Sequence, residues 1–130
     1  MTTEPGRPVR IEILTRRDCP GRAMAVAIVE RVVEETGVLA RVELIYLATE
    51  LQAQRRRFLG SPSVRVDGRD VEPGSNGRVG FTLACRIYCG ESGLQGWPDA
   101  RWVRNALRIA AGQPLTGYSS PSEKSSATSP

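Results

Sequence analysis

The 130-residue sequence contains no histidine and a single lysine, Lys124. The absence of histidine excludes Ser/His/Asp and Cys/His catalysis, together with every zinc site that uses an imidazole ligand. The net charge of +4 therefore comes almost wholly from arginine. Because the arginines are scattered and only 5% of the residues are aromatic, the composition favours no nucleic-acid surface.

Long apolar runs are also lacking, since no stretch approaches the roughly 18 residues that a membrane span needs. Residues 1–8 are polar and carry no apolar signal segment, so we expect a flexible N-terminus on a cytoplasmic protein. Residues 113–130 are rich in Ser, Thr, Pro and Gly, which predicts a disordered tail whose removal leaves the melting temperature nearly unchanged. Residues 9–112 are then one domain, large enough to fold without a disulfide or structural metal.

The first half of this domain has the pattern of a strand, a helix and a second strand. Apolar and charged residues alternate over residues 9–13, which predicts a strand. Pro20 is expected in the first turn of a helix whose apolar stripe covers residues 25–33 and which stops at Gly37. Residues 42–47 are nearly continuous in apolar side chains, as expected for a parallel strand covered on both faces.

A second helix and a hairpin follow. Thr49 and Gln52 have the spacing of a capping box, and Gly60 is the expected end of this short helix. Residues 64–71 predict two antiparallel strands around the turn Asp67-Gly68.

The remaining segment has less pattern until the last helix. Residues 72–96 are rich in glycine and show no clear period, whereas Pro98 is expected in the first turn of an amphipathic helix closed by Gly112. The predicted element order is strand, helix, strand, helix, strand, strand, helix. This order indicates an α/β, thioredoxin-like fold with a mixed four-stranded sheet and helices on both faces.

Cys19 is the first candidate for chemistry. It follows the first strand at the expected start of the first helix, where free backbone N–H groups and the helix dipole favour a thiolate. Arg16, Arg17 and Arg22 add positive potential, which Asp18 opposes. We expect Cys19 to be a reactive nucleophile; the alternative is a buried, inert cysteine.

Ser61-Pro62 is the second signal of a site. It directly precedes the third strand, at the end of the sheet to which the first strand delivers Cys19. A proline at this place cannot donate a hydrogen bond to a further strand. We predict that the Ser61-Pro62 peptide bond is cis and that Pro62 lies against Cys19.

Three segments together carry a family resemblance: Asp18-Cys19-Pro20-Gly21, residues 57–71, and Cys85-Arg86-Ile87-Tyr88. They resemble a bacterial group of small thioredoxin-family proteins, over Val9 to about Ile109, and some similar short proteins are labelled alkylmercury lyase. The resemblance implies thiol-redox chemistry with a thiol-containing protein or small-molecule thiol as partner. We expect no cofactor.

The sequence departs from a dithiol oxidoreductase at the turn itself, because Cys19-Pro20-Gly21-Arg22 lacks the second cysteine of Cys-x-x-Cys. A mixed disulfide at Cys19 then needs another thiol for its release. Cys85 and Cys89 are the candidates, since their spacing puts both on one side of a helix or of an extended segment. Alternatively, both are small core residues beneath a long loop.

Three functions remain open at this point. In the first, Cys19 acts as nucleophile and Cys85 or Cys89 as resolving thiol. In the second, a soft-metal or organomercurial site gathers Cys19, Cys85 and Cys89, with Asp18 as proton donor. In the third, the domain is a binding module without catalysis.

Overall fold

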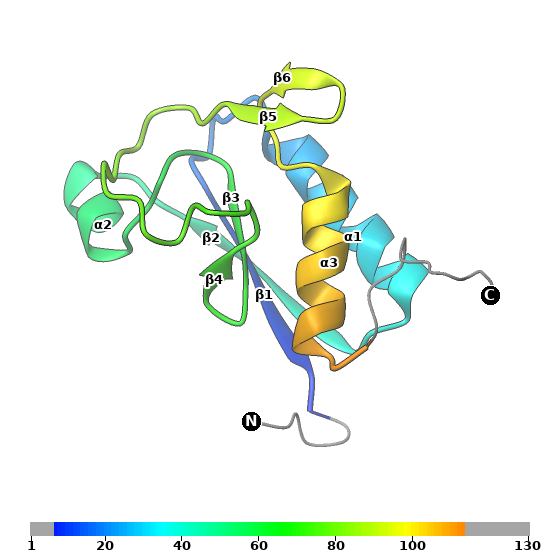
Figure 1. Cartoon of the computed structure of the whole chain (residues 1–130). Helices are drawn as coiled ribbons and strands as arrows, with labels where there is room; N and C mark the ends of the chain where they lie inside the picture. The colour runs from blue at the N-terminus through cyan, green and yellow to red at the C-terminus, as the bar shows by residue number, and fades with distance from the viewer. Residues whose placement is uncertain (1–6, 114–130) are drawn as a thin grey trace.

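The computed structural model describes residues 7–113 and shows an α/β fold around a mixed four-stranded sheet (Figure 1). The sheet has the order β2-β1-β3-β4, formed by β1 (Val9–Thr15), β2 (Ala40–Tyr46), β3 (Ser63–Val66) and β4 (Arg69–Asp70). The helices are α1 (Arg22–Thr36), α2 (Glu50–Arg55) and α3 (Ala100–Ala110). The predicted disordered tail, residues 113–130, and the predicted flexible N-terminus lie outside the described residues, except for positions 7, 8 and 113.

The predicted pairings are present: the first two strands are parallel and the two hairpin strands are antiparallel. β1 pairs in parallel with β2 and antiparallel with β3, which in turn pairs antiparallel with β4. The turn between β3 and β4 has positive φ at Asp67 (48°) and Gly68 (86°), the conformation that Asp-Gly favours in tight hairpins. Asp67 also accepts a hydrogen bond from the backbone N–H of Arg10 at 3.0 Å, which ties the hairpin to β1.

Two apolar clusters place helices on both faces of the sheet, as predicted. The larger lies between the sheet and the pair α1 and α3, which stand side by side in Figure 1. Its fully buried members include Ile11, Val29, Val32, Val64, Val103 and Leu107. The smaller cluster joins Leu14 of β1 to Ala53 of α2 and to Phe58, because alternate residues of a strand face opposite sides.

The expectation that residues 42–47 are covered on both faces is wrong. β2 is an edge strand with β1 as its neighbour in the sheet, and Val42 and Leu44 remain 44% and 41% exposed. They share a face with Ile11 and Ile13, which are buried because β1 lies in the middle of the sheet. An apolar run therefore marked a parallel strand here, but not a central one.

Two prolines lie just before helices rather than in their first turns. α1 begins at Arg22 with Gly21 as its N-cap, so Pro20 belongs to the preceding turn. α3 begins at Ala100, and its N-cap Asp99 accepts a hydrogen bond from the N–H of Arg101 at 2.8 Å. Since an N-cap side chain satisfies one of the free N–H groups, Asp99 fixes the start of α3 and leaves Pro98 outside.

The second helix has the predicted start but a different end. Thr49 and Gln52 form both hydrogen bonds of a capping box. The helix stops at Arg55 and not at Gly60, because Arg57 takes a left-handed conformation with φ of 55°. Glycine is the usual residue at such a position, so an arginine there does not signal the end of a helix.

Residues 72–96, which lacked a clear period, contain a small separate hairpin. Strands β5 (Tyr88–Gly90) and β6 (Gly93–Gln95) form a two-stranded sheet of their own within residues 7–113, at the end of the molecule where α1 and α3 begin (Figure 1). Three residues per strand are too few for a recognisable alternation. Within positions 7–113, no helix combines the length and apolar character needed to cross a membrane.

Candidate functional site

Cys19 lies in the turn that joins β1 to α1. Its N–H donates to the carbonyl of Arg16 at 3.4 Å, and its own carbonyl accepts from the N–H of Arg22 at 3.2 Å. Because α1 begins only at Arg22, Cys19 stands before the helix and not in its first turn, contrary to our expectation. The residue is buried, with 7% of its surface exposed.

Pro62 lies against the same turn. The Ser61-Pro62 bond is cis, as predicted, and Pro62 is fully buried. A Cβ atom placed on Gly21 would lie 3.2 Å from Cδ of Pro62 and 2.1 Å from the carbonyl oxygen of Gly96. The turn after Cys19 is therefore enclosed by the start of β3 on one side and by the chain after β6 on the other.

Ser61 connects this turn to the segment that carries Cys85. The hydroxyl of Ser61 accepts from the N–H of Arg16 at 2.9 Å. Its backbone N–H donates to the carbonyl of Ala84 and its carbonyl accepts from the N–H of Arg86, both at 2.9 Å. Cys85, between these two residues, consequently pairs with Ser61 as a parallel bridge.

Arg16 is the charged neighbour that Cys19 and Cys85 share. Its guanidinium donates to Asp18 at 3.1 Å and to the carbonyl of Leu83 at 3.2 Å. The hydrogen bond to Asp18 and the charge of that carboxylate raise the pKa of Arg16, and the charges of Cys85 and Cys19 raise it further. The guanidinium is therefore within electrostatic reach of both thiols, although Cys19 and Cys85 are far apart in the sequence.

Cys89 and Asp18 are placed differently. Cys89 is exposed on β5 opposite Leu94, and no interaction within residues 7–113 joins it to Cys19. Asp18 points to solvent with 79% of its side chain exposed. In the part of the chain that the structure describes, no three His, Cys, Asp or Glu side chains gather closely enough to hold a metal ion. The four groups proposed for mercury are thus not assembled. Cys85 and Cys89 are also not core residues, because both are exposed.

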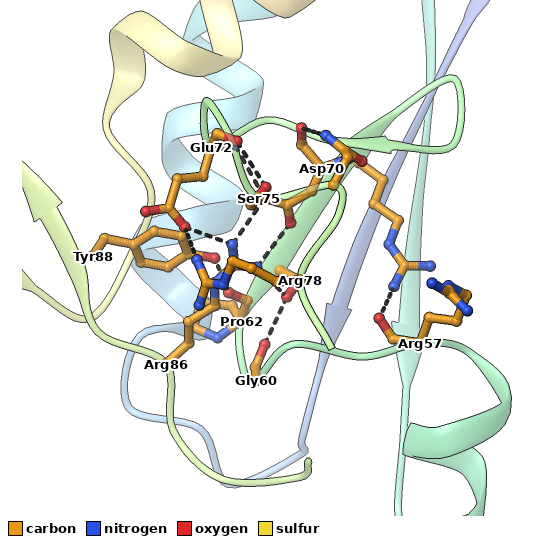
Figure 2. Close-up of polar contacts among 12 residues, drawn as sticks. Arg57, Gly60, Pro62, Asp70, Glu72, Ser75, Arg78, Arg86 and Tyr88 are labelled. Atoms are coloured by element: carbon orange, nitrogen blue, oxygen red, sulfur yellow. Dashed lines mark hydrogen bonds and ion pairs between the residues drawn. The ribbon is translucent and has the colours of Figure 1, made fainter. Parts of the chain in front are cut away.

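A buried ion cluster lies directly beyond Cys85 and was not predicted from the sequence (Figure 2). The Arg86 side chain is 2% exposed and donates from both terminal nitrogens to Asp70 at 2.8 Å. It also donates to Glu72 and to the hydroxyl of Ser63, again at 2.8 Å. The ring of Tyr88 lies 4.5 Å from the guanidinium carbon.

Charge compensation explains why these groups stay ionised. Burial alone would lower the pKa of Arg86, but the hydrogen bond and charge of Asp70 outweigh it, and the pKa is raised. Burial would conversely raise the pKa of Asp70, and the hydrogen bond and charge of Arg86 hold it below its ordinary value. The pair is therefore charged throughout the neutral range.

The cluster holds the segment around Pro62 in place. Ser63, which accepts from Arg86, donates to the carbonyl of Gly60 at 2.7 Å, and Tyr88 donates to the carbonyl of Pro62 at 2.6 Å. Because Arg86 follows Cys85 directly, the same contacts fix Cys85 beside Ser61. An arginine between a cysteine and an apolar residue carries no sequence signal of such a role, since its partners lie 14 to 23 positions away.

The hydroxyl of Tyr88 gives a first test of this arrangement. We expect Tyr88→Phe to lower the free energy of unfolding by about 1–3 kcal/mol, because it removes the donor to a buried carbonyl and keeps the ring beneath Arg86. Urea unfolding measures the change. Tyr46→Phe is the control, since the hydroxyl of Tyr46 has only a 3.5 Å contact with Arg22, and it should change stability little.

Comparison with models of known protein families finds no match for this sequence, and comparison with curated proteins finds none either.

Proposed function

We propose that this protein is a thioredoxin-like thiol-disulfide redox protein in which Cys19 and Cys85 form a reversible disulfide. The observation that supports the pairing is that Ser61 joins the two backbone segments: its hydroxyl accepts from Arg16 in the turn of Cys19, and its backbone bridges to Cys85. Disulfide exchange needs a second thiol within reach of the first, and the turn of Cys19 and the segment of Cys85 supply one each. The α/β fold with Pro62 against the Cys19 turn is consistent with this chemistry.

The exchange is written with a disulfide of a small molecule or protein as oxidant. The thiolate of Cys85 attacks one sulfur of that disulfide, forms a mixed disulfide and releases the first partner thiolate. The thiolate of Cys19 then attacks Sγ of Cys85 and releases the second partner thiolate. Two electrons pass to the partner, and the protons lost by the two cysteines are taken up by the released thiolates.

Exposure supports this order of attack. Cys85 is exposed and can meet a partner from solvent, whereas Cys19 is buried within the turn. This order reverses the roles expected from the sequence, since Cys85 attacks the partner and Cys19 is the resolving thiol in the second, intramolecular step. Of the two candidates for the other thiol, Cys85 is preferred over Cys89 because Cys85 bridges to Ser61, which is bonded to the turn of Cys19, whereas Cys89 pairs with Leu94 in the separate hairpin.

The disulfide is tested by mild oxidation with a small-molecule disulfide, followed by alkylation and peptide mass spectrometry. We expect one intramolecular bond between Cys19 and Cys85, reversed by reductant, because Ser61 holds the two segments that carry them together. Cys89→Ser is the matched control and should form the same bond. Cys85→Ser should leave Cys19 as a free thiol, because the first attack is lost, and Cys19→Ser should trap the mixed disulfide at Cys85.

Two results would contradict the proposal. If all three thiols stay free after oxidation, the domain is better explained as a non-catalytic binding module. If Cys85→Ser leaves an intramolecular disulfide in place, Cys89 is the partner of Cys19 and the geometric assignment is wrong.

A further inference from the structure

A pocket on the opposite side of β3 from α1 and α3 is not used by the proposed thiol chemistry. It lies between the end of α2, the hairpin β3–β4 and the chain after β4, and its volume is about 100 Å³. Since one water needs roughly 10–15 Å³ on this measure, the pocket has room for several waters or for one small polyatomic ion. Arg57, Arg65 and Arg78 line it, with Asp70 as the carboxylate among the lining residues.

The charges around this pocket do not balance. Asp70 is fully engaged by Arg86, and Glu72 is shared between Arg86 and Arg78. The carboxylates of Asp70 and Glu72 therefore lie among four guanidinium groups, those of Arg57, Arg65, Arg78 and Arg86. The sum of these six charges is +2. Within residues 7–113, the guanidinium groups of this set without a carboxylate partner are those of Arg57 and Arg65. The nearby Glu12 is already in an ion pair with Arg56, at 3.7 Å.

Arg65 is held rigidly without a charged partner. One terminal nitrogen, Nη2, donates to the carbonyls of Arg56 and Arg57 at 2.7 and 2.9 Å. Within residues 7–113, Nε and Nη1 of Arg65 have no acceptor. Burial lowers the pKa of Arg65 from its ordinary value in spite of the charges of Asp70 and Glu12. A bound anion would compensate this half-buried charge.

Arg57 occupies its place at a cost in backbone energy. Its φ of 55° lies in the left-handed region, which a glycine would adopt without strain, and its guanidinium lies 4.9 Å from the ring centre of Phe81. In the described range of the chain it forms no ion pair with a carboxylate. An arginine with a strained backbone and no carboxylate partner, on the wall of a pocket, is more typical of a binding site than of a structural contact.

We propose that this pocket binds a doubly charged tetrahedral oxyanion, either free phosphate or the phosphoryl group of a small molecule. The volume fits one such group, and the excess of two positive charges matches its charge. Guanidinium groups bind phosphate oxygens through paired, charge-assisted hydrogen bonds, and Arg57, Arg65 and Arg78 supply donors from three separate segments. The site is independent of Cys19 and Cys85.

The test is a titration of the full chain with inorganic phosphate and, separately, with phenyl phosphate, by calorimetry at constant ionic strength set with chloride. We expect saturable binding of one ion per chain. Arg57→Gly should weaken binding at least about tenfold, because it removes a charged donor, while the melting temperature without phosphate stays equal or rises, since glycine relieves the left-handed strain. Arg31→Ala, on the exposed face of α1, removes the same charge elsewhere and should leave binding unchanged.

The outcomes separate the sources of the anion. Tighter binding of phenyl phosphate supports a phosphoryl group carried by a larger molecule, and tighter binding of inorganic phosphate supports the free ion. The proposal is overturned if phosphate binds no better than chloride, or if Arg57→Gly and Arg31→Ala weaken binding equally.

Discussion

Arg86→Met is expected to lower the free energy of unfolding by about 3–5 kcal/mol at neutral pH. The side chain is buried, and its removal leaves Asp70 and Glu72 with charges that no other buried cation neutralises within residues 7–113. Methionine keeps much of the apolar volume, so the loss reports mainly on the ion cluster. Urea unfolding at pH 7 measures it.

Arg78→Met is the matched control, because Arg78 pairs with the same Glu72 at 3.0 Å but is half exposed. Its loss should cost no more than about 1 kcal/mol. Equal effects of the two substitutions would show that burial of Arg86 contributes nothing to stability.

Acid should reduce the difference between the Arg86→Met variant and the parent protein. The pKa of Asp70 in the folded protein is held below its ordinary value by the hydrogen bond and charge of Arg86, which outweigh the opposing effect of burial. The resulting stabilisation is present above the unfolded pKa of about 4 and is lost as the pH falls through the lower folded value. Urea unfolding of both proteins at pH 7 and at about pH 3 should show this convergence; a constant difference would contradict it.

Gly21→Ala is expected to destabilise the fold by about 3 kcal/mol or more. Gly21 has φ of −86°, which alanine adopts easily, so the expected loss comes from contact alone. The added Cβ would lie 2.1 Å from the carbonyl oxygen of Gly96, a backbone atom that can move away only if the chain after β6 shifts. The melting temperature and urea unfolding report the loss.

Gly77→Ala provides the control for this substitution, since nothing lies within 4 Å of a Cβ at Gly77 and its φ is not in the left-handed region. It should change stability by no more than about 0.5 kcal/mol. If Gly21→Ala behaves in the same way, the turn after Cys19 and the chain after β6 are not in contact.

The sequence predicted those features that local chemistry determines. Gly37 ends α1 with φ of 67°, Asp67-Gly68 forms the hairpin turn, and Thr49 with Gln52 forms the capping box. Each of these depends on neighbours within four residues. The cis bond at Pro62, which the structure confirms, was predicted from the place of this proline at the start of the third strand, at the end of the sheet that carries Cys19.

The features that were missed depend on contacts between distant residues. Nothing near Arg86 in the sequence indicates that its partners are Ser63, Asp70 and Glu72, and β5 and β6 are too short to show a period. The bridge between Cys85 and Ser61 likewise joins residues 24 positions apart. The periodicity of apolar residues indicates helices and strands. The contacts of Arg86 and the bridge between Ser61 and Cys85 form only when those elements pack together.

The pairing of Ser61 with the chain on either side of Cys85 also limits how a partner can approach. Many proteins bind a polypeptide by adding it as a strand to an open backbone edge. Here both the N–H and the carbonyl of Ser61 are occupied by Ala84 and Arg86 of the same chain. A polypeptide cannot pair its backbone with Ser61 unless residues 84–86 first separate from Ser61. Under the proposed chemistry, a disulfide partner must reach Cys85 from solvent by its sulfur alone, which favours compact disulfides over extended peptides as substrates.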